Sequence, residues 1–381
     1  MRFLAFVFTL LLFGTSHAQP LPTTIPVPAV NARAWLLMDY ATGQVLAAQE
    51  ADTRLEPASL TKVMTTYLVA DALAQKTLSL QQPVTVSERA WRTQGSRTFV
   101  PVNKGVLVDD LFKGMVIQSG NDASVALAEA IGGGSEDAFA EMMNRTAQRM
   151  GLKDTHFLNA SGYFEGPAPN HYSTARDLAR LAAALIRDHP ETHALHAMKE
   201  YTYNGIRQHN RNSLLWADPT VDGLKTGHSS AAGYCLIATA KRGPRRLISV
   251  VLGTASVEAR ARDSLNLLNW GYTAFDAVKL YDKGQAISQL KVFKGVQNLV
   301  GAGFAEDFVV SVPRGMADKV SAQLVSKQPL IAPIAAGSPI GTLKLAVGGQ
   351  PWGEYPVVAQ SAVPVAGFLG RLWDDIRLFF Q

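Results

Sequence analysis

The sequence predicts an α+β fold, followed by a small all-β domain and a terminal amphipathic helix. Strand-like runs at residues 34–40 and 44–48, and again at 234–240 and 247–252, flank a middle segment with helical periodicity. An antiparallel sheet built from both ends, with the helices packed on it, buries the apolar residues of both. From about residue 280 the chain turns into short Val-, Ile- and Leu-rich stretches separated by Gly and Pro, which are typical of a domain made of strands.

The N-terminal segment has the features of a secretory signal peptide, which we place at residues 1–18. A positive start is followed by an apolar run at 3–13 and by a small-x-small sequence ending at Ala18, after which we expect cleavage. The only cysteine, Cys235, cannot form an internal disulfide and is expected to be a buried packing residue. Export without disulfides favours a bacterial periplasm.

The composition excludes several classes of protein. The chain has 381 residues, of which 47% are hydrophobic and 18% are charged, so a disordered, collagen-like or coiled-coil chain is ruled out. After the first 18 residues, no apolar run approaches the roughly 20 residues that are needed to cross a bilayer. The net charge is only +5 and the basic residues are scattered, so we expect no nucleic-acid partner.

Each element before residue 280 has a local signal. The first two strands are joined at Thr42-Gly43, as in a hairpin. Pro57-Ala58-Ser59 opens a helix whose apolar residues recur at a spacing of 3.6. The last two strands are separated by a turn at 241–244. Further helical patterns cover residues 108–115, 123–130, 138–150, 174–188 and 257–270.

These changes of pattern divide the mature chain into a domain at 19–279, a β-rich domain at 280–362 and a helix at 363–381. On a helical projection, seven apolar residues of the last segment fall within an arc of about 140°. They are Phe368, Leu369, Leu372, Trp373, Ile376, Phe379 and Phe380. The segment is too short and too charged to span a bilayer, so we expect it to lie in the membrane interface. The alternative is a helix that docks on its own domain.

Three short motifs carry the candidate chemistry. In Ser59-Leu60-Thr61-Lys62, positions i and i+3 of a helix share a face, so the amine lies beside the hydroxyl. A serine hydroxyl needs a base, and a lysine is one only when burial or positive neighbours lower its pKa. Ser119-Gly120-Asn121 offers a hydroxyl and a carboxamide in one turn. Lys225-Thr226-Gly227, followed by His228, leads into a strand and suits a substrate that offers a carboxylate and a backbone.

In this order, the motifs resemble the S-x-x-K, S-x-N and K-T-G set of the penicillin-recognising serine hydrolases. The sequences around them, at 56–62, 118–123, 204–208 and 222–228, are similar to the low-molecular-weight D-alanyl-D-alanine carboxypeptidases of the penicillin-binding protein 5 and 6 type (peptidase S11-like). The resemblance covers most of the mature chain. It implies a penicillin-binding, transpeptidase-like domain, a β-rich second domain and an anchoring helix on the outer face of the inner membrane.

The resemblance also implies a role for each residue. Ser59 attacks the carbonyl of the terminal D-Ala-D-Ala bond of a peptidoglycan pentapeptide and forms an acyl-enzyme, and Lys62 is its base. Ser119 relays the proton to the leaving D-alanine, and β-lactams acylate the same serine. The backbone N–H groups of Ser59 and His228 form the oxyanion hole. The expected substrate-binding residues are Asn121, Lys225, Thr226, Gly227, His228 and Arg207, and no cofactor or metal is implied.

Several alternatives stay open at this level. A β-lactamase of the class A type adds an E-x-x-L-N loop, but Glu165 and Asn170 are five residues apart and separated by two prolines, so efficient β-lactam hydrolysis is not expected. A D,D-endopeptidase uses the same machinery on cross-links. A non-catalytic peptidoglycan-binding scaffold is the alternative of another class. The histidines at 189–196 have some of the spacing of a zinc site, but Pro190 interrupts a continuous helix and the default is solvated histidines.

Overall fold

A five-stranded antiparallel sheet forms the centre of the first domain, in the order β2-β1-β9-β8-β7. Its strands are β1 (Ala34–Asp39), β2 (Val45–Gln49), β7 (Val221–Ser229), β8 (Gly233–Arg242) and β9 (Arg245–Thr254). The computed structural model of the chain describes residues 25–379, so the expected signal peptide lies outside the described residues. The expected sheet, built from strands at both ends of a helical segment, is confirmed, but it has a fifth strand, β7, where the sequence analysis expected only a lead into the next strand.

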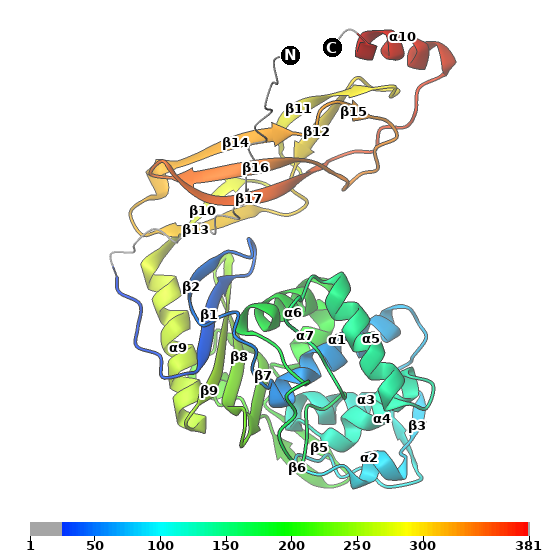
Figure 1. Cartoon of the computed structure of the whole chain (residues 1–381), viewed down its shortest axis with the longest axis vertical. Helices are drawn as coiled ribbons and strands as arrows, with labels where there is room; N and C mark the ends of the chain where they lie inside the picture. The colour runs from blue at the N-terminus through cyan, green and yellow to red at the C-terminus, as the bar shows by residue number, and fades with distance from the viewer. Residues whose placement is uncertain (1–24, 380–381) are drawn as a thin grey trace, which may run out of the picture.

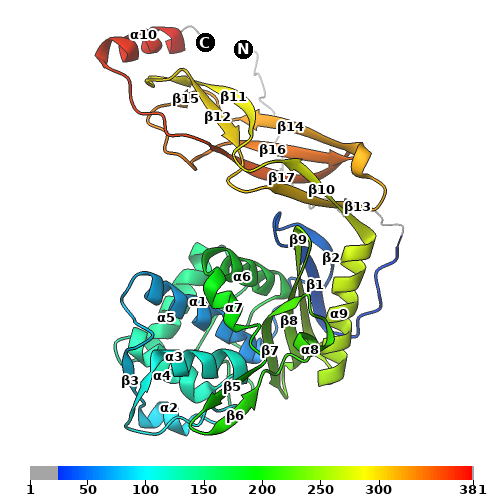
Figure 2. The same cartoon turned by 180° about the vertical axis from the view of Figure 1, so that it is seen from behind.

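Both faces of this sheet are covered, and strand periodicity decides which residue faces which layer. Along β1, Trp35 and Leu37 join the apolar cluster on one face, whereas Leu36 and Met38 join the cluster on the other. Helix α9 (Val257–Ala274) packs on the first face (Figure 1). Helices α1 (Lys62–Ala74) and α6 (Ala175–Asp188) pack on the second face (Figure 2). Cys235 is buried in this second cluster, as expected.

A helical lobe lies beyond the second face of the sheet. It also contains two small two-stranded sheets that the sequence pattern did not indicate, and the helix expected at 108–115 continues as a π-helix to Gln118. The elements of the lobe and of its connections are η1 (Ala58–Thr61), β3 (Pro83–Thr85), α2 (Glu88–Arg92), β4 (Gly105–Leu107), α3 (Val108–Lys113), η2 (Gly114–Gln118), α4 (Asn121–Ile131), α5 (Glu136–Arg149), α7 (Pro190–Leu195), β5 (Glu200–Tyr203), β6 (Ile206–His209) and α8 (Leu214–Ala217).

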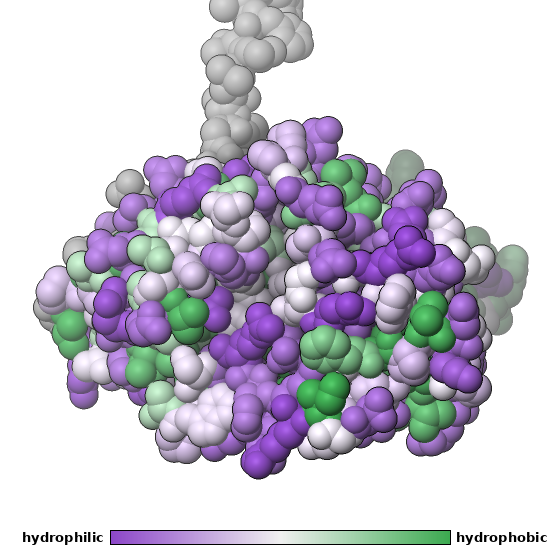
Figure 3. All heavy atoms as spheres, turned by 90° about the horizontal axis from the view of Figure 1, so that it is seen from below, coloured by the Kyte–Doolittle hydropathy of each residue, from purple (hydrophilic) through white to green (hydrophobic). Residues whose placement is uncertain are grey.

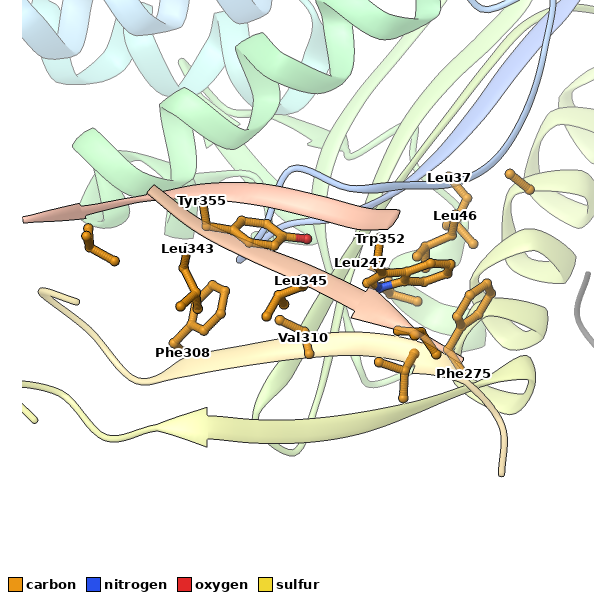
Figure 4. Packing of buried hydrophobic residues seen from close by; sticks show 14 of the residues in the cluster. Leu37, Leu46, Leu247, Phe275, Phe308, Val310, Leu343, Leu345, Trp352 and Tyr355 are labelled. Atoms are coloured by element: carbon orange, nitrogen blue, oxygen red, sulfur yellow. The ribbon is translucent and has the colours of Figure 1, made fainter. Parts of the chain in front are cut away.

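The second domain is made of strands, as expected, apart from one turn of 3₁₀ helix, η3 (Ala317–Lys319). A pair of strands, β10-β13, faces a six-stranded sheet in the order β14-β16-β17-β12-β11-β15. Side chains such as Val310, Leu345 and Tyr355 fill the space between them (Figure 4). The strands are β10 (Phe275–Tyr281), β11 (Ala286–Phe293), β12 (Leu299–Gly303), β13 (Phe308–Pro313), β14 (Val320–Ser326), β15 (Leu330–Ile331), β16 (Pro339–Val347) and β17 (Gln350–Ala359).

The two domains share one apolar core across their junction. Leu37 and Leu247 of the first domain belong to the same buried cluster as Phe275 and Trp352, which Figure 4 shows from close by. Polar groups in the junction are also paired: the buried Arg245 guanidinium donates to the carbonyl oxygen of Phe275 at 2.9 Å. The two domains are therefore joined by direct apolar packing and by hydrogen bonds.

Helix α10 (Phe368–Phe379) lies at the end of the second domain away from the first (Figure 1). Its polar side faces the domain: the buried Asp374 carboxylate accepts a hydrogen bond from the Lys294 N–H at 2.6 Å, and the Lys294 amine pairs with Asp375. The described side chains of the predicted apolar face are 47% to 85% exposed, although Trp373 and Ile376 also line a pocket with Val292 and Leu299 of the second domain. Within residues 25–379, no helix is both long enough and apolar enough to cross a membrane.

Candidate active site

A cleft of about 710 Å³ lies between the edge of the sheet and the helical lobe. Six of the nine residues singled out in the sequence line it: Ser59 from η1, Ser119 and Asn121 from the start of α4, and Thr226, Gly227 and His228 from β7. Figure 3 views the molecule from the end of the first domain, where mostly polar side chains surround a hollow. The three motifs, far apart in the sequence, therefore meet at one site.

Ser59 and Lys62 are neighbours because η1 runs directly into α1. The Lys62 Nζ lies 3.0 Å from the Ser59 Oγ, 2.6 Å from the Asn121 Oδ1 and 2.7 Å from the carbonyl oxygen of Ser161. The lysine is fully buried. Burial, together with the nearby positive charge of Arg211, lowers the pKa of Lys62 to about 7. Lys62 can therefore exist as a neutral amine near neutral pH.

The partners of Lys62 also fix where its lone pair points. The carbonyl oxygen of Ser161 and the carboxamide oxygen of Asn121 can only accept hydrogen bonds, so they take up both N–H bonds of the neutral amine. The remaining direction is that of the Ser59 hydroxyl, which can donate its proton to the lone pair. This arrangement is that of a serine nucleophile with an adjacent base.

Ser119 lies between two helices, where η2 ends and α4 begins. It adopts a left-handed conformation with a φ of +67°. The buried Asp122 carboxylate holds this turn against the preceding loop by accepting hydrogen bonds from the N–H groups of Thr98 and Phe99, each at 2.8 Å. The Ser119 hydroxyl is buried at the wall of the cleft and has no hydrogen-bond partner among the described residues. It is available to a bound substrate.

Strand β7 forms the other wall and is the edge strand of the sheet. An edge strand presents backbone groups that an extended peptide can pair with. A Cβ on Gly227 would lie only 3.0 Å from the carbonyl oxygen of Pro57, so glycine lets β7 approach η1 closely. Lys225 of β7 is buried, and burial together with the positive charge of Lys62 lowers its pKa well below the ordinary value. The His228 ring stacks on Tyr234 with centroids 4.0 Å apart.

Comparisons with known proteins agree with this geometry. The family model "D-alanyl-D-alanine carboxypeptidase" matches residues 21–256, and "Penicillin-binding protein 5, C-terminal domain" matches 275–365. The chain is 42% identical over 366 residues to the D-alanyl-D-alanine carboxypeptidase DacC of Escherichia coli, covering 94% of this chain and 90% of that protein. The chain belongs to the D-alanyl-D-alanine carboxypeptidase family.

Two solved structures extend this result. Penicillin-binding protein 5 from Haemophilus influenzae superimposes with a TM-score of 0.79 at 40% identity, covering 89% of this chain and 99% of that one. Penicillin-binding protein D2 from Listeria monocytogenes, in its ampicillin-bound form, gives a TM-score of 0.59 at 32% identity and covers 65% of this chain and 100% of that one. The expected family and the expected fold, a penicillin-binding domain followed by an all-β domain, are thereby confirmed.

The other three of the nine expected site residues of this carboxypeptidase are not among the residues that line the cleft: Lys62 and Lys225 are buried, and Arg207 is on the surface. Arg207 lies on β6 and is not among the residues that line the cleft; its Nε donates to Glu200 at 3.0 Å on the surface. Alternation along the strand explains this, because the next residue, Gln208, points inward and donates to the carbonyl oxygen of Arg97. In this structure Arg207 therefore lies on the surface of β6 and not at the cleft.

Two arginines that the sequence analysis did not select lie at the cleft instead. Arg211 and Arg260 line it, and burial lowers the pKa of both guanidinium groups. Arg260 donates to the carbonyl oxygen of Gly227 at 3.0 Å. It shares the buried face of α9 with Ser264 and Leu267, so a charged residue on the apolar side of a helix was a usable signal. Arg211 follows a short strand in a polar loop and had no such signal.

The side chains that suggested a zinc site or a β-lactamase-like loop do not form such sites in the described structure. His189 contacts Asp71, His193 contacts Thr239, and His196 contacts the carbonyl oxygen of Leu224. Among the described residues, no group of three or more His, Cys, Asp or Glu side chains is arranged to hold a metal ion. Glu165, considered for a β-lactamase-like loop, is exposed and is not among the residues that line the cleft. Burial raises the pKa of the Cys235 thiol to about 11, so it is unreactive.

Proposed function

We propose that this carboxypeptidase removes the terminal D-alanine from peptidoglycan pentapeptides through an acyl-enzyme on Ser59, within a catalytic domain at residues 19–279. The observation that carries the proposal is the buried Lys62 amine, 3.0 Å from the Ser59 hydroxyl and with two carbonyl-type acceptors on its other sides. A lysine in these surroundings is a base at neutral pH. The family assignment supports a D-Ala-D-Ala substrate.

The residues of the cleft supply each step of the reaction. Lys62 takes the hydroxyl proton of Ser59 while the Oγ bonds to the carbonyl carbon of the D-Ala-D-Ala bond. The N–H groups of Ser59 and His228 stabilise the oxyanion. Ser119 relays this proton, giving its own hydroxyl proton to the amide nitrogen and receiving the one held by Lys62; the C–N bond breaks, and D-alanine leaves. Water then hydrolyses the ester and restores the serine. A β-lactam enters the same step, but its leaving nitrogen stays attached to the acyl group.

Substrate recognition combines the edge of β7 with the positive end of the cleft. An extended peptide paired with β7 brings its carboxylate toward Thr226 and Arg211. Arg211 lines the cleft, and its guanidinium forms no ion pair or hydrogen bond with another described residue. Arg207, by contrast, already forms an ion pair with Glu200. We assign the carboxylate of the substrate to Arg211 in place of Arg207. Asn121, Lys225 and Gly227 complete the proposed binding residues.

Arg211→Ala is expected to raise KM for a peptide ending in D-Ala-D-Ala by about 10- to 100-fold, since a charge-assisted hydrogen bond contributes about 1.5–3 kcal/mol. Arg207→Ala is the matched control and should change KM by less than about twofold, because surface ion pairs contribute little. Steady-state kinetics on the acid and on the C-terminal amide of one peptide check this. An equal loss on both peptides would contradict the assignment to the carboxylate.

The activity itself is tested by release of D-alanine from a soluble peptide that ends in D-Ala-D-Ala. Release that is blocked by penicillin supports the carboxypeptidase. No release, but cleavage of purified cross-linked wall fragments, would instead establish a D,D-endopeptidase. If folded protein cleaves neither substrate, the remaining reading is a wall-binding scaffold, and the proposal fails.

We further propose that the enzyme is periplasmic and is held on the outer face of the inner membrane by residues 363–381, with residues 280–362 as a spacer. The contacts of α10 support this proposal, because Asp374 and Asp375 turn its polar side to the domain and leave the apolar side outward. An exposed aromatic and aliphatic helix face of this kind is suited to the membrane interface.

Sedimentation with phospholipid vesicles tests the anchor. The mature chain should bind vesicles with little dependence on salt, because the charges of the helix nearly cancel and apolar burial drives binding. A variant ending at Ala362 should remain in the supernatant. Leu372→Asp/Ile376→Asp should do the same, whereas Arg371→Asp, on the polar side, should still bind. Equal sedimentation of the shortened and complete chains would exclude this role for the helix.

A further inference from the structure

His171 is a buried residue outside the catalytic motifs, and its contacts lead to the nucleophile. It is 1% exposed and lies in the loop between α5 and α6. Its Nε2 is 2.7 Å from the Thr61 Oγ1, and the Thr61 hydroxyl donates to the carbonyl oxygen of Ala58 at 2.7 Å. Ala58 directly precedes Ser59. The chain of contacts therefore ends on the peptide unit that carries the nucleophile.

The direction of these hydrogen bonds is fixed by the neighbours of the ring. The N–H of Leu158 donates to the His171 Nδ1 at 2.9 Å, so this nitrogen carries no proton. Burial lowers the pKa of His171 to about 3, so the ring is neutral and its single proton is on Nε2. The Nε2–H donates to the Thr61 Oγ1, whose own proton points to Ala58. Each donor in the chain has one acceptor.

The Ala58 carbonyl, at the end of this series of hydrogen bonds, determines the direction of the Ser59 N–H. The C=O of Ala58 and the N–H of Ser59 belong to one planar peptide unit, so fixing one fixes the other in the opposite direction. Ser59 is in the first turn of η1, where a helix leaves its N–H groups without intrahelical acceptors. Ala58 adopts a φ of +47°, which a residue with a side chain rarely takes. This conformation needs support from its surroundings.

The same loop packs against the peptide from another side. A Cβ on Gly162 would lie 1.9 Å from the carbonyl oxygen of Ala58 and 2.5 Å from the Thr61 Oγ1, so there is no space for the turn to move that way. Phe157 and Phe164 contact the His171 ring, with centroids 5.8 Å and 5.0 Å away. The ring is thus held in place, and its Nε2 can hold Thr61.

We propose that His171 is a positioning residue which, through Thr61, orients the Ala58–Ser59 peptide so that the Ser59 N–H is aimed at the developing oxyanion. The inference rests on the proposed acyl-enzyme at Ser59. It predicts a defect in the transition state rather than in substrate binding, because the N–H is needed when the carbonyl oxygen becomes charged.

The test uses the mature chain and the first-order rate of penicillin labelling at saturating penicillin, which reports on folded molecules only. His171→Leu and Thr61→Val should each lower this rate and kcat by about 10- to 100-fold, less than the full loss of an oxyanion donor, with KM nearly unchanged. The double variant should be no slower than the worse single variant, since both changes break the same series of hydrogen bonds. His171→Gln, which can both accept and donate, should keep most of the rate.

His156→Leu is the matched control, because His156 lies on the same loop but contacts Asn170 and Tyr172 rather than η1. It should label at the unaltered rate. If His171→Leu does not fold, Thr61→Val and His171→Gln still decide the matter. Labelling of Thr61→Val at the wild-type rate, or additive losses in the double variant, would overturn the proposal. If even the unaltered chain is not labelled at Ser59, the proposed function fails instead.

Discussion

Ser59→Ala is expected to abolish both penicillin labelling and the release of D-alanine, with a loss in kcat of about 10⁶-fold, the size seen when a serine nucleophile is removed. The substitution takes away the oxygen that forms the ester in the proposed mechanism. The remaining donors of the cleft would still bind the substrate, so affinity for the peptide should persist. Labelling followed by mass spectrometry, together with a D-alanine assay, measures both effects.

The cleft supplies its own control for this experiment. Ser230 is an exposed serine that also lines the cleft, but within residues 25–379 it has no lysine partner comparable to Lys62. Ser230→Ala should keep the labelling rate within about twofold, since it removes an exposed hydroxyl that has no part in the proposed reaction. A covalent penicillin adduct on Ser59→Ala protein would mean that another residue is the nucleophile.

Lys62→Met should slow acylation by about 10³-fold or more, because the Ser59 hydroxyl loses the base that accepts its proton. Methionine keeps much of the volume of the side chain and removes only the amine. In the unaltered enzyme the neutral lysine is the active form, and its pKa is lowered to about 7. Acylation should therefore be slow below pH 7, rise as Lys62 loses its proton and level off above that pH.

The variant should lose this pH dependence along with the rate. Second-order rate constants for a β-lactam between pH 5.5 and 8.5, measured on protein that circular dichroism shows to be folded, separate the two effects. A folded Lys62→Met protein that is acylated at the unaltered rate would rule out Lys62 as the base. An unchanged pH profile would assign the titration to another group.

The sequence predicted those parts of the site whose residues are close together along the chain, but not the contacts between distant segments. Ser59 and Lys62 are i and i+3 of one helical segment, so their proximity followed from helical geometry alone. The convergence of Ser119 and β7 on them is a tertiary contact, and periodicity carries no information on it. Only the resemblance placed these segments together. Arg207 shows its limit, since strand alternation in β6 turns that side chain to the surface.

In the fold, too, the elements with a strong local pattern could be predicted and the others could not. The strand runs at the ends and the helices between them were correctly predicted, because burial against two layers imposes a strong pattern. The two-stranded sheets β3-β4 and β5-β6 have three or four residues per strand, too few for alternation to be visible. Amphipathicity predicted α10, but the side that docks depends on Asp374 and its contact with Lys294, which no local pattern contains.

The apolar core that runs through the junction of the two domains also makes the stability of each domain depend on the other. Trp352 lies on a strand far from the cleft, yet it packs in the same cluster as Leu37 and Leu247 of the catalytic sheet. A cavity made at such a position lowers the free energy of unfolding of the structure around the whole cluster, because close-packed interiors relax only in part. Inherited or selected changes in the β-rich domain can thus reduce the amount of working enzyme in the cell, even though every residue that touches the substrate is intact.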